Sequence, residues 1–196
     1  MLGLSQFSGR LTRLPNQRKL AVVHSSNGTL VGGRFFRIVA VDLENEAIST
    51  AWLGLLDHYA GDPMGGGEGL SAYAKMHLVD DLKRLPPFHG ALAFSGDEAV
   101  GLINCFAGFS TFAAKPLLNI HDIVTRDDRR GQGVGQALLQ WAEQRAHELG
   151  CCKLTLEILS GNTRAMASYA RAGYAPYVLD PAAGHALLMQ KLLPEL

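Results

Sequence analysis

The chain has 196 residues, 18 basic and 18 acidic side chains, 47% hydrophobic residues and 22 glycines. Glycine makes up about 11% of the chain, against roughly 7% in average proteins. A chain of this length buries a core that needs neither disulfides nor a structural metal, and its three cysteines have no spacing typical of either. The zero formal charge argues against a nucleic-acid-binding protein, which usually carries a positive excess. We therefore expect one soluble globular protein in a reducing compartment, with no metal and no nucleic-acid partner.

Two stretches of the chain bear on membrane insertion and targeting. Residues 99–114, the longest stretch without charge after the N-terminal region, are too short and too polar to cross a bilayer. Residues 1–9 lack the basic start and long apolar run of a secretory signal, and an organellar transit peptide is the less favoured alternative. We expect a cytoplasmic protein with no membrane partner, in which residues 1–33 form a loosely attached extension and residues 34–196 the functional domain.

Hydrophobic spacing and turn residues predict the elements in the first half of this domain. Residues 35–41 are typical of a strand, and Asp42 is then expected to cap a helix with one apolar face (Ile48, Trp52, Leu55, Leu56 and Tyr59). Residues 61–69, with five glycines and a proline, must form a loop. A second helix over residues 71–85 ends at two prolines.

The second half of the chain predicts strands that alternate with helices. In order, it indicates a hairpin over 91–95 and 100–106, a strand over 117–125, a helix ending at 149, a strand over 153–159, a helix over 163–172 and a closing hairpin over 174–179 and 186–192. This order predicts a single α/β domain with a mixed, mostly antiparallel sheet that contains one β-α-β unit. The closing hairpin could offer an edge for a homodimer, although a monomer is equally allowed.

The segment from Arg129 to Gly135 carries the strongest local signal. It reads Arg-Arg-Gly-Gln-Gly-Val-Gly and lies between a predicted strand and a predicted helix. Glycines let the backbone approach a ligand closely, and the free N–H groups of a helix's first turn suit a phosphate, to which Arg130 would add charge-assisted hydrogen bonds. A Walker A loop would need a lysine after the glycines, and a dinucleotide loop would need a small residue where Gln136 stands. The structural alternative is a glycine-rich connector with two exposed arginines.

Two sequence motifs occur together in this half of the chain. Arg130, Gly133 and Gly135 have the spacing Arg-x-x-Gly-x-Gly, and a second motif over 162–174 runs from an asparagine through a tyrosine to Gly-Tyr. Together they resemble the GNAT superfamily of acetyl-CoA-dependent N-acetyltransferases, in which the first motif is the pyrophosphate-binding loop. The matching motifs cover about residues 117–192, and the looser order of strands and helices extends the resemblance back to about Phe36. The combination of the two motifs is specific, whereas either motif alone would be weak.

The resemblance implies a fold, a reaction and a co-substrate. It implies a single GNAT-like domain with a β-α-β core that binds acetyl-CoA, and direct transfer of the acetyl group to a primary amine of a small molecule, without a metal. Asp127 and Arg129 depart from the proline and the apolar residue that the family often has at these positions, which bears on affinity more than on fold. The alternatives are acetylation of a protein N-terminus or lysine, a non-catalytic acyl-CoA-binding sensor and, more remotely, a nucleotide-binding oxidoreductase.

The resemblance also implies roles for individual residues. Tyr169 would protonate the CoA thiolate, Asn162 would hydrogen-bond the pantetheine arm, and a backbone N–H of the strand ending at Thr125 would bind the carbonyl oxygen. Asn162 and Tyr169 are seven residues apart and so share a helix face. The structural alternatives are that Asn162 only caps its helix and that Tyr169 is only a core aromatic. The residues expected to contact the co-substrate are Ile123, Val124, Thr125, Arg130, Gly131, Gln132, Gly133, Val134, Gly135, Gln136, Asn162 and Tyr169.

His121 and Asp122 are polar neighbours in a strand otherwise made for the interior of the sheet. Burial of such side chains costs free energy unless they are paired or functional, and in a regular strand the two would point to opposite faces. A histidine accepts a proton near neutral pH, so His121 is the first candidate for the catalytic base or water-positioning residue, with Asp122 as the substitute. Alternatively, both side chains make structural hydrogen bonds.

The loop over residues 61–69 lies where the resemblance places one wall of the amine site. Its glycines suit a mobile lid, and Asp62 and Glu68 could attract an amine, while a plain connector is the alternative. Cys151 and Cys152 open a strand whose far end is the one near the co-substrate, so we do not expect either to form an acyl-enzyme.

Overall fold

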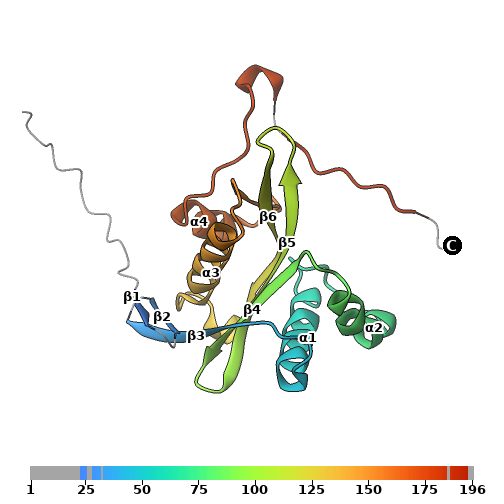
Figure 1. Ribbon diagram of the computed structural model, residues 1–196, viewed down its shortest axis with the longest axis vertical. Coiled ribbons are helices and arrows are strands. Elements are labelled where there is room, and N and C mark those ends of the chain that lie inside the picture. The colour runs from blue at the N-terminus through green and yellow to red at the C-terminus, as the bar shows by residue number, and fades with distance from the viewer. Residues whose placement is uncertain (1–22, 26–27, 32, 185, 194–196) are drawn as a thin grey trace, which may run out of the picture.

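The computed structural model describes residues 23–25, 28–31, 33–184 and 186–193, which form one seven-stranded sheet with helices on both faces (Figure 1). The strands, which follow one another across the sheet in chain order, are β1 (Val23–Ser25), β2 (Gly28–Val31), β3 (Arg34–Ala40), β4 (Phe88–Ser95), β5 (Glu98–Ser110), β6 (Lys115–Thr125) and β7 (Leu154–Leu156). The helices are α1 (Glu46–Ala60), α2 (Ala72–Lys83), α3 (Val134–Glu148) and α4 (Thr163–Arg171). None of the helices in these ranges is long and apolar enough to cross a membrane. The predicted mixed, mostly antiparallel α/β sheet is confirmed, since only β6 and β7 pair in parallel.

Side chains alternate along the central strands and fill two apolar layers. On one face of the sheet, Ala91 and Ala93 of β4 belong to a cluster with α3, and on the other face Leu92 and Phe94 belong to a cluster with Trp52 of α1. Figure 1 shows α3 and α4 on one side of the sheet and α1 and α2 on the other. Because successive side chains of β4 point to opposite faces, its odd-numbered residues pack under α3 and its even-numbered residues pack under α1.

The cap of α1 is Asn45 and not the predicted Asp42. Asn45 Oδ1 accepts a hydrogen bond from Ile48 N at 3.2 Å. Asp42 Oδ1 accepts one from Glu44 N at 3.0 Å and closes a turn before the helix. Both residue types are good caps, so the turn geometry, and not the residue type, decides where the helix begins.

The predicted β-α-β unit is confirmed, because β6 leads through α3 to β7, which lies parallel to β6. β7 has three residues instead of the seven predicted, since it pairs with β6 only from Leu118 to Ile120. At that point β6 carries a bulge, in which His121 is the extra residue against β5. Beyond Ile120 the parallel strands separate, and no strand of the described residues flanks the β7 side of β6 from 121 to 125.

The sheet begins inside the segment that was predicted to be a loose extension. β2 pairs with β3 from Thr29 opposite Phe36 to Val31 opposite Arg34, and the Val31 side chain is buried in the α3 layer. Residues 1–22 lie outside the described residues. The part of the predicted extension that the structure does describe thus contributes strands and a core side chain.

The prediction of a closing hairpin is wrong. In the described chain after α4, residues 174–179 and 186–192 contain no strand, and Leu187 and Leu188 are 82% and 75% exposed. The apolar side chains of 186–192 follow one another instead of alternating, so this segment does not present one apolar face to a sheet. The edge that this hairpin could have offered to a homodimer is therefore absent from the described residues.

Candidate active site

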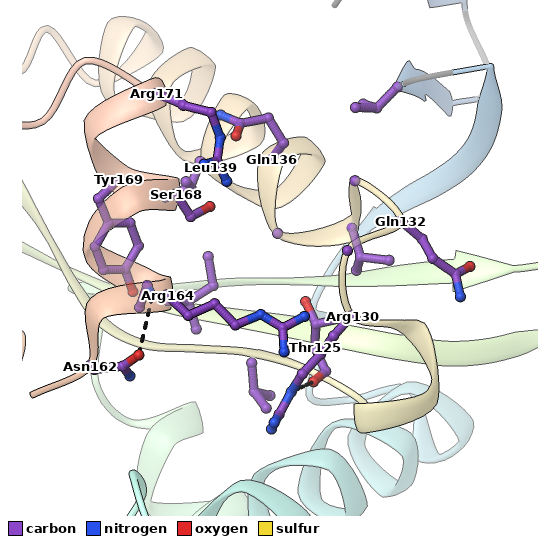
Figure 2. A pocket seen from close by; sticks show the side chains of 18 of the residues that line it. Thr125, Arg130, Gln132, Gln136, Leu139, Asn162, Arg164, Ser168, Tyr169 and Arg171 are labelled. Carbon is purple, nitrogen blue, oxygen red and sulfur yellow. Dashed lines mark hydrogen bonds between the residues drawn. The ribbon is translucent and has the colours of Figure 1, made fainter.

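A cavity of about 500 Å³ opens where β6 and β7 separate (Figure 2). Its walls come from the end of β6, the loop before α3, the first turn of α3, α4, and the end of α1 with the loop that follows. The structure brings all twelve residues that were predicted to contact the co-substrate to this one space, namely Ile123, Val124, Thr125, Arg130, Gly131, Gln132, Gly133, Val134, Gly135, Gln136, Asn162 and Tyr169. The two sequence motifs, with 26 residues between Gly135 and Asn162, therefore face the same cavity.

The glycine loop shapes one end of the cavity. Gly131 and Gly133 have φ angles of +74° and +99°, which residues with a side chain rarely adopt. Gly133 is also the cap of α3 and has no side chain that could accept from the first N–H groups of the helix. The first turn, from Val134 on, therefore presents N–H groups without helical acceptors, together with the positive end of the helix dipole, as an anion site requires.

Among the described residues, four arginines line the cavity, and only Arg130 was predicted to do so. Arg130 comes from the glycine loop, Arg164 and Arg171 from α4, and Arg34 from β3. Figure 2 shows Arg130 and Arg164 directed into the same space between the loop and α4. Arg164 and Arg171 are two helical turns apart, so their spacing was a usable signal, whereas nothing in the sequence around Arg34 connects it to this site. The excess of positive charge suits a ligand with several phosphates.

Asn162 and Tyr169 lie on the α4 side of the cavity (Figure 2). Asn162 Oδ1 accepts a hydrogen bond from Ala165 N at 3.1 Å and so caps α4, as the structural alternative predicted. The amide nitrogen of Asn162 takes no part in this cap and is available to a ligand. Tyr169 is partly buried and packs on Tyr174, with ring centroids 6.0 Å apart. Burial and, secondarily, the charge of Tyr59 raise the pKa of Tyr169 to about 12, so its phenol keeps its proton at neutral pH.

His121 and Asp122 do not line the cavity, and the expectation that they point to opposite faces is wrong. The β6 bulge inserts His121 as the extra residue, so both side chains lie on the α1 face of the sheet. His121 packs edge-on against Phe106 of the α1 layer, with 5.5 Å between ring centroids. Asp122 Oδ2 accepts a hydrogen bond from Asn104 Nδ2 at 3.0 Å.

A buried hydrogen-bond chain orients Asp122. Trp52 Nε1 donates to Asn104 Oδ1 at 2.7 Å, so the amide nitrogen of Asn104 must face Asp122. Burial and, secondarily, the charge of Asp122 raise the pKa of Tyr59, whose side chain lines the cavity. Sequence reasoning missed both Asn104 and Tyr59 as site residues, although a single asparagine within an apolar strand was a signal for a paired buried group.

The loop after α1 supplies the wall opposite α4, with Asp62 and Met64 among the lining residues. Asp62 organises this loop, since its Oδ1 accepts from Met64 N at 2.8 Å and its carbonyl accepts from the N–H groups of residues 65–67. Asp62 Oδ2 lies 2.7 Å from Arg130 Nη2. The hydrogen bond from Met64 and then the one from Arg130 hold the pKa of Asp62 below its usual range, so the carboxylate is ionised. Glu68, the other acid considered for an amine, does not line the cavity.

The donors fit acetyl-CoA better than they fit a metal. Arg130 and the helix N–H groups lie at the glycine-loop end, and the Asn162 amide and the Tyr169 phenol lie on the α4 wall together with Arg164 and Arg171, which suits a ligand that carries phosphates, amides and a thioester. In the part of the chain that the structure describes, no group of three or more histidine, cysteine, aspartate or glutamate side chains could hold a metal ion.

This structure is an α/β fold in which two parallel strands separate beside a phosphate-type glycine loop. A family model described as "Acetyltransferase (GNAT) family" matches residues 52–174, which is more than half of the chain. The chain belongs to this family, and the resemblance predicted from its motifs is confirmed.

Two curated proteins and a solved structure are similar to the chain. The streptothricin acetyltransferase of Streptomyces lavendulae is 37% identical over 87 residues, which is 43% of this chain and 46% of that protein. The aminoalkylphosphonate N-acetyltransferase of Salmonella typhimurium is 33% identical over 89 residues, 45% of this chain and 58% of that protein. The matches thus span about half the length of the curated relatives. The crystal structure of a probable acetyltransferase has the same fold, with a TM-score of 0.68 and 20% identity over 81% of this chain and 99% of that one.

Proposed function

We propose that this protein transfers the acetyl group of acetyl-CoA directly to a primary amine of a small molecule. The observation that carries the proposal is the single cavity in which the glycine loop, Asn162 and Tyr169 face Tyr59 and Asp62. Family membership supports it, as do two relatives whose names specify acetylation of streptothricin and of aminoalkylphosphonates.

Backbone groups would do much of the binding. Bound acetyl-CoA supplies the thioester, and the first-turn N–H groups of α3, together with Arg130, would hold its phosphates. The edge of β6 from Ile123 to Thr125 lines the cavity and has no described strand beside it on the β7 side. Its N–H groups would donate to the thioester carbonyl oxygen, where a fixed donor is most effective as negative charge develops.

Tyr169 would hold a proton at its phenol oxygen and direct it to the leaving sulfur. With a pKa of about 12, the phenol is a weaker acid than an ordinary thiol near 8.5, so complete proton transfer from the phenol to the thiolate is unfavourable. We therefore expect Tyr169 to contribute mainly a hydrogen bond to the sulfur, with the proton moving only as charge builds there.

Neither Asp122 nor His121 lines the cavity, so either would accept the proton that the amine loses only through an intervening group or water. The charge of Asp122 acts on Tyr59, which does line the cavity, and this favours Asp122. We expect Asp122→Asn to lower kcat by about tenfold to a hundredfold, because the variant removes an oriented carboxylate near Tyr59. His121→Gln should lower kcat by less than threefold. Steady-state kinetics of both variants at saturating acetyl-CoA measures the difference. The reverse order would assign the base to His121, and wild-type kcat in both variants would exclude both residues.

The test of the function is an acetyl-CoA thiol-release screen. We expect release with at least one class of amine among streptothricin, polyamines, aminoglycosides, amino acids and an aminoalkylphosphonate. Short peptides with a free N-terminus or a lysine belong to the same screen, since release with peptides alone would indicate a protein acetyltransferase. Calorimetric titration with CoA runs in parallel. CoA binding without thiol release from any amine would indicate a non-catalytic acyl-CoA sensor, and displacement of CoA by NAD would indicate an oxidoreductase.

A further inference from the structure

We propose that Asp62 is the carboxylate that recognises the amine, and that acetyl-CoA uncovers it by drawing Arg130 away from the Asp62–Arg130 ion pair. This inference rests on the proposed function and adds to it the class of amine and the order of binding. It arises from one contact that joins the two sides of the cavity, because Asp62 belongs to the loop after α1 and Arg130 to the loop before α3.

Arg130 has little capacity left for a phosphate while this contact persists. Its Nη2 lies 2.7 Å from Asp62 Oδ2 and 2.6 Å from Asp127 Oδ1, and its Nε donates to the carbonyl oxygen of Thr125 at 3.3 Å. A guanidinium has two hydrogens on each terminal nitrogen and one on Nε, so only Nη1 remains uncommitted among these contacts. Two parallel hydrogen bonds to a phosphate therefore require Arg130 to release at least one carboxylate.

Asp62 is the carboxylate that a phosphate should displace. Its side chain is 15% exposed, whereas that of Asp127 is 66% exposed. Asp127 is three residues from Arg130 in the same loop and can stay paired when Arg130 turns to a phosphate at the glycine loop, whereas Asp62 lies in the loop across the cavity and cannot follow. The low exposure of Asp62 strengthens its pairing with Arg130, so breaking this contact costs free energy. The exchange breaks the contact between Asp62 and Arg130. The affinity for acetyl-CoA is therefore lower by the free energy that this contact contributes.

Release would change the partner of one oxygen and leave the loop folded. Asp62 Oδ1 still accepts from Met64 N, and the Asp62 carbonyl still accepts from the N–H groups of residues 65–67. Only Oδ2 loses its partner. The carboxylate thus stays on the cavity wall and becomes available to a ligand once Arg130 has turned to a phosphate.

The charge around the cavity indicates which amines would use this carboxylate. Asp62 is the only acid among the described residues that line it, and four arginines line it as well. Phosphates of the co-substrate would neutralise part of the arginine charge, and Asp62 would then offer the one carboxylate partner for an ammonium group. The cavity therefore fits an amine with net positive charge better than an amine that carries a phosphonate.

Calorimetric titration with CoA tests the first half of the proposal without any amine. Asp62→Asn keeps a side-chain oxygen for Met64 N but removes the charge that competes for Arg130, so we expect CoA to bind threefold to tenfold more tightly. Asp128→Asn is the matched control, because Asp128 lies in the same loop region but pairs with Arg126 and not with Arg130. We expect less than a twofold change there. Equal gains in both variants would indicate a general field effect and overturn the proposal, as would unchanged affinity in Asp62→Asn.

Kinetics with streptothricin and an aminoalkylphosphonate test the second half. In Asp62→Asn we expect the KM of streptothricin to rise at least tenfold, while CoA affinity improves and the KM of the aminoalkylphosphonate changes less than twofold. A variant that is merely misfolded would lose affinity for both ligands. Turnover with unchanged KM values in Asp62→Asn would overturn the inference and leave the proposed function standing. Absence of CoA binding to the unaltered protein would instead overturn the proposed function, and the inference with it.

Discussion

Replacing Tyr169 by phenylalanine is expected to lower kcat by about a hundredfold or more, within the range that a positioned proton donor contributes. The ring would still pack on Tyr174 at the same position, and only the phenol oxygen would be lost. Because this oxygen is assigned to the leaving sulfur and not to the phosphates, the Kd of CoA should stay within about threefold of its original value. Steady-state turnover and calorimetric CoA titration of the same preparation measure the two effects separately.

Tyr174→Phe is the matched control for this experiment. Tyr174 packs against Tyr169, but it does not line the active-site cavity, and its buried hydroxyl has no hydrogen-bond partner among the residues that the structure describes. Removing that hydroxyl should leave kcat within about twofold and leave the protein equally stable or about 1 kcal/mol more stable. Equal losses of kcat in Tyr169→Phe and Tyr174→Phe would mean that the pair acts only through packing. Unimpaired kcat in Tyr169→Phe would remove this residue from the mechanism.

Sequence reasoning predicted the parts of the site whose conformation depends on neighbouring residues in the chain. The glycine loop lies between β6 and α3 as expected, because a backbone with positive φ at Gly131 and Gly133 needs glycine at those positions and a helix can begin directly after them. The α4 motif lies beside it for a similar reason. Asn162 caps the helix, and the spacing to Tyr169 then decides that both reach the same cavity.

The parts that were predicted wrongly depend on pairing between distant strands. The faces of His121 and Asp122 are decided by a bulge in β6, and the bulge exists only because β5 and β6 pair with one residue in excess. The shortness of β7 has the same origin, since β7 leaves β6 just before the bulge. The bulge shifts the phase of the alternation, so that Leu118, Ile120 and Ile123 contact the α3 layer and Val124 the α1 layer. Because Ile123 and Val124 are both apolar, the sequence does not show which of them faces which layer.

Contacts between residues far apart in the chain account for the rest of what was missed. Asp62 and Arg130 are 68 residues apart in sequence, and Trp52 and Asn104 are 52 apart. Each residue alone has an ordinary interpretation as a loop acid, a loop base, a core aromatic or an isolated polar side chain. Their roles arise only when the sheet brings α1 and its loop against the end of β6, which is a property of packing and not of local sequence.

Replacing Gly133 by alanine is expected to weaken CoA binding at least tenfold and to lower the melting temperature. The φ angle of +99° disfavours any residue with a Cβ by about 1–2 kcal/mol. In addition, the new Cβ would lie 2.8 Å from Val31 Cγ1 and 3.0 Å from Val31 Cβ, which is closer than van der Waals contact. Val31 is buried in the α3 layer at the end of β2. The loop must therefore shift, and the N–H groups of the first turn of α3 would shift with it away from the phosphates.

Two further variants separate backbone strain from the clash with Val31. Gly131 also has a positive φ, of +74°, but a Cβ there would meet no atom closer than Arg164 Nη2 at 4.0 Å, so Gly131→Ala should destabilise the protein less than Gly133→Ala. Val31→Ala removes Cγ1, the atom that would lie nearest to the new methyl group of Gly133→Ala, and keeps only the Cβ contact at 3.0 Å. In the double variant Val31→Ala with Gly133→Ala, we expect the loss of CoA affinity to be smaller than the product of the single losses, since removal of the clash lets the loop return. Strictly multiplicative losses would show that the contact between β2 and the glycine loop does not position the phosphate site.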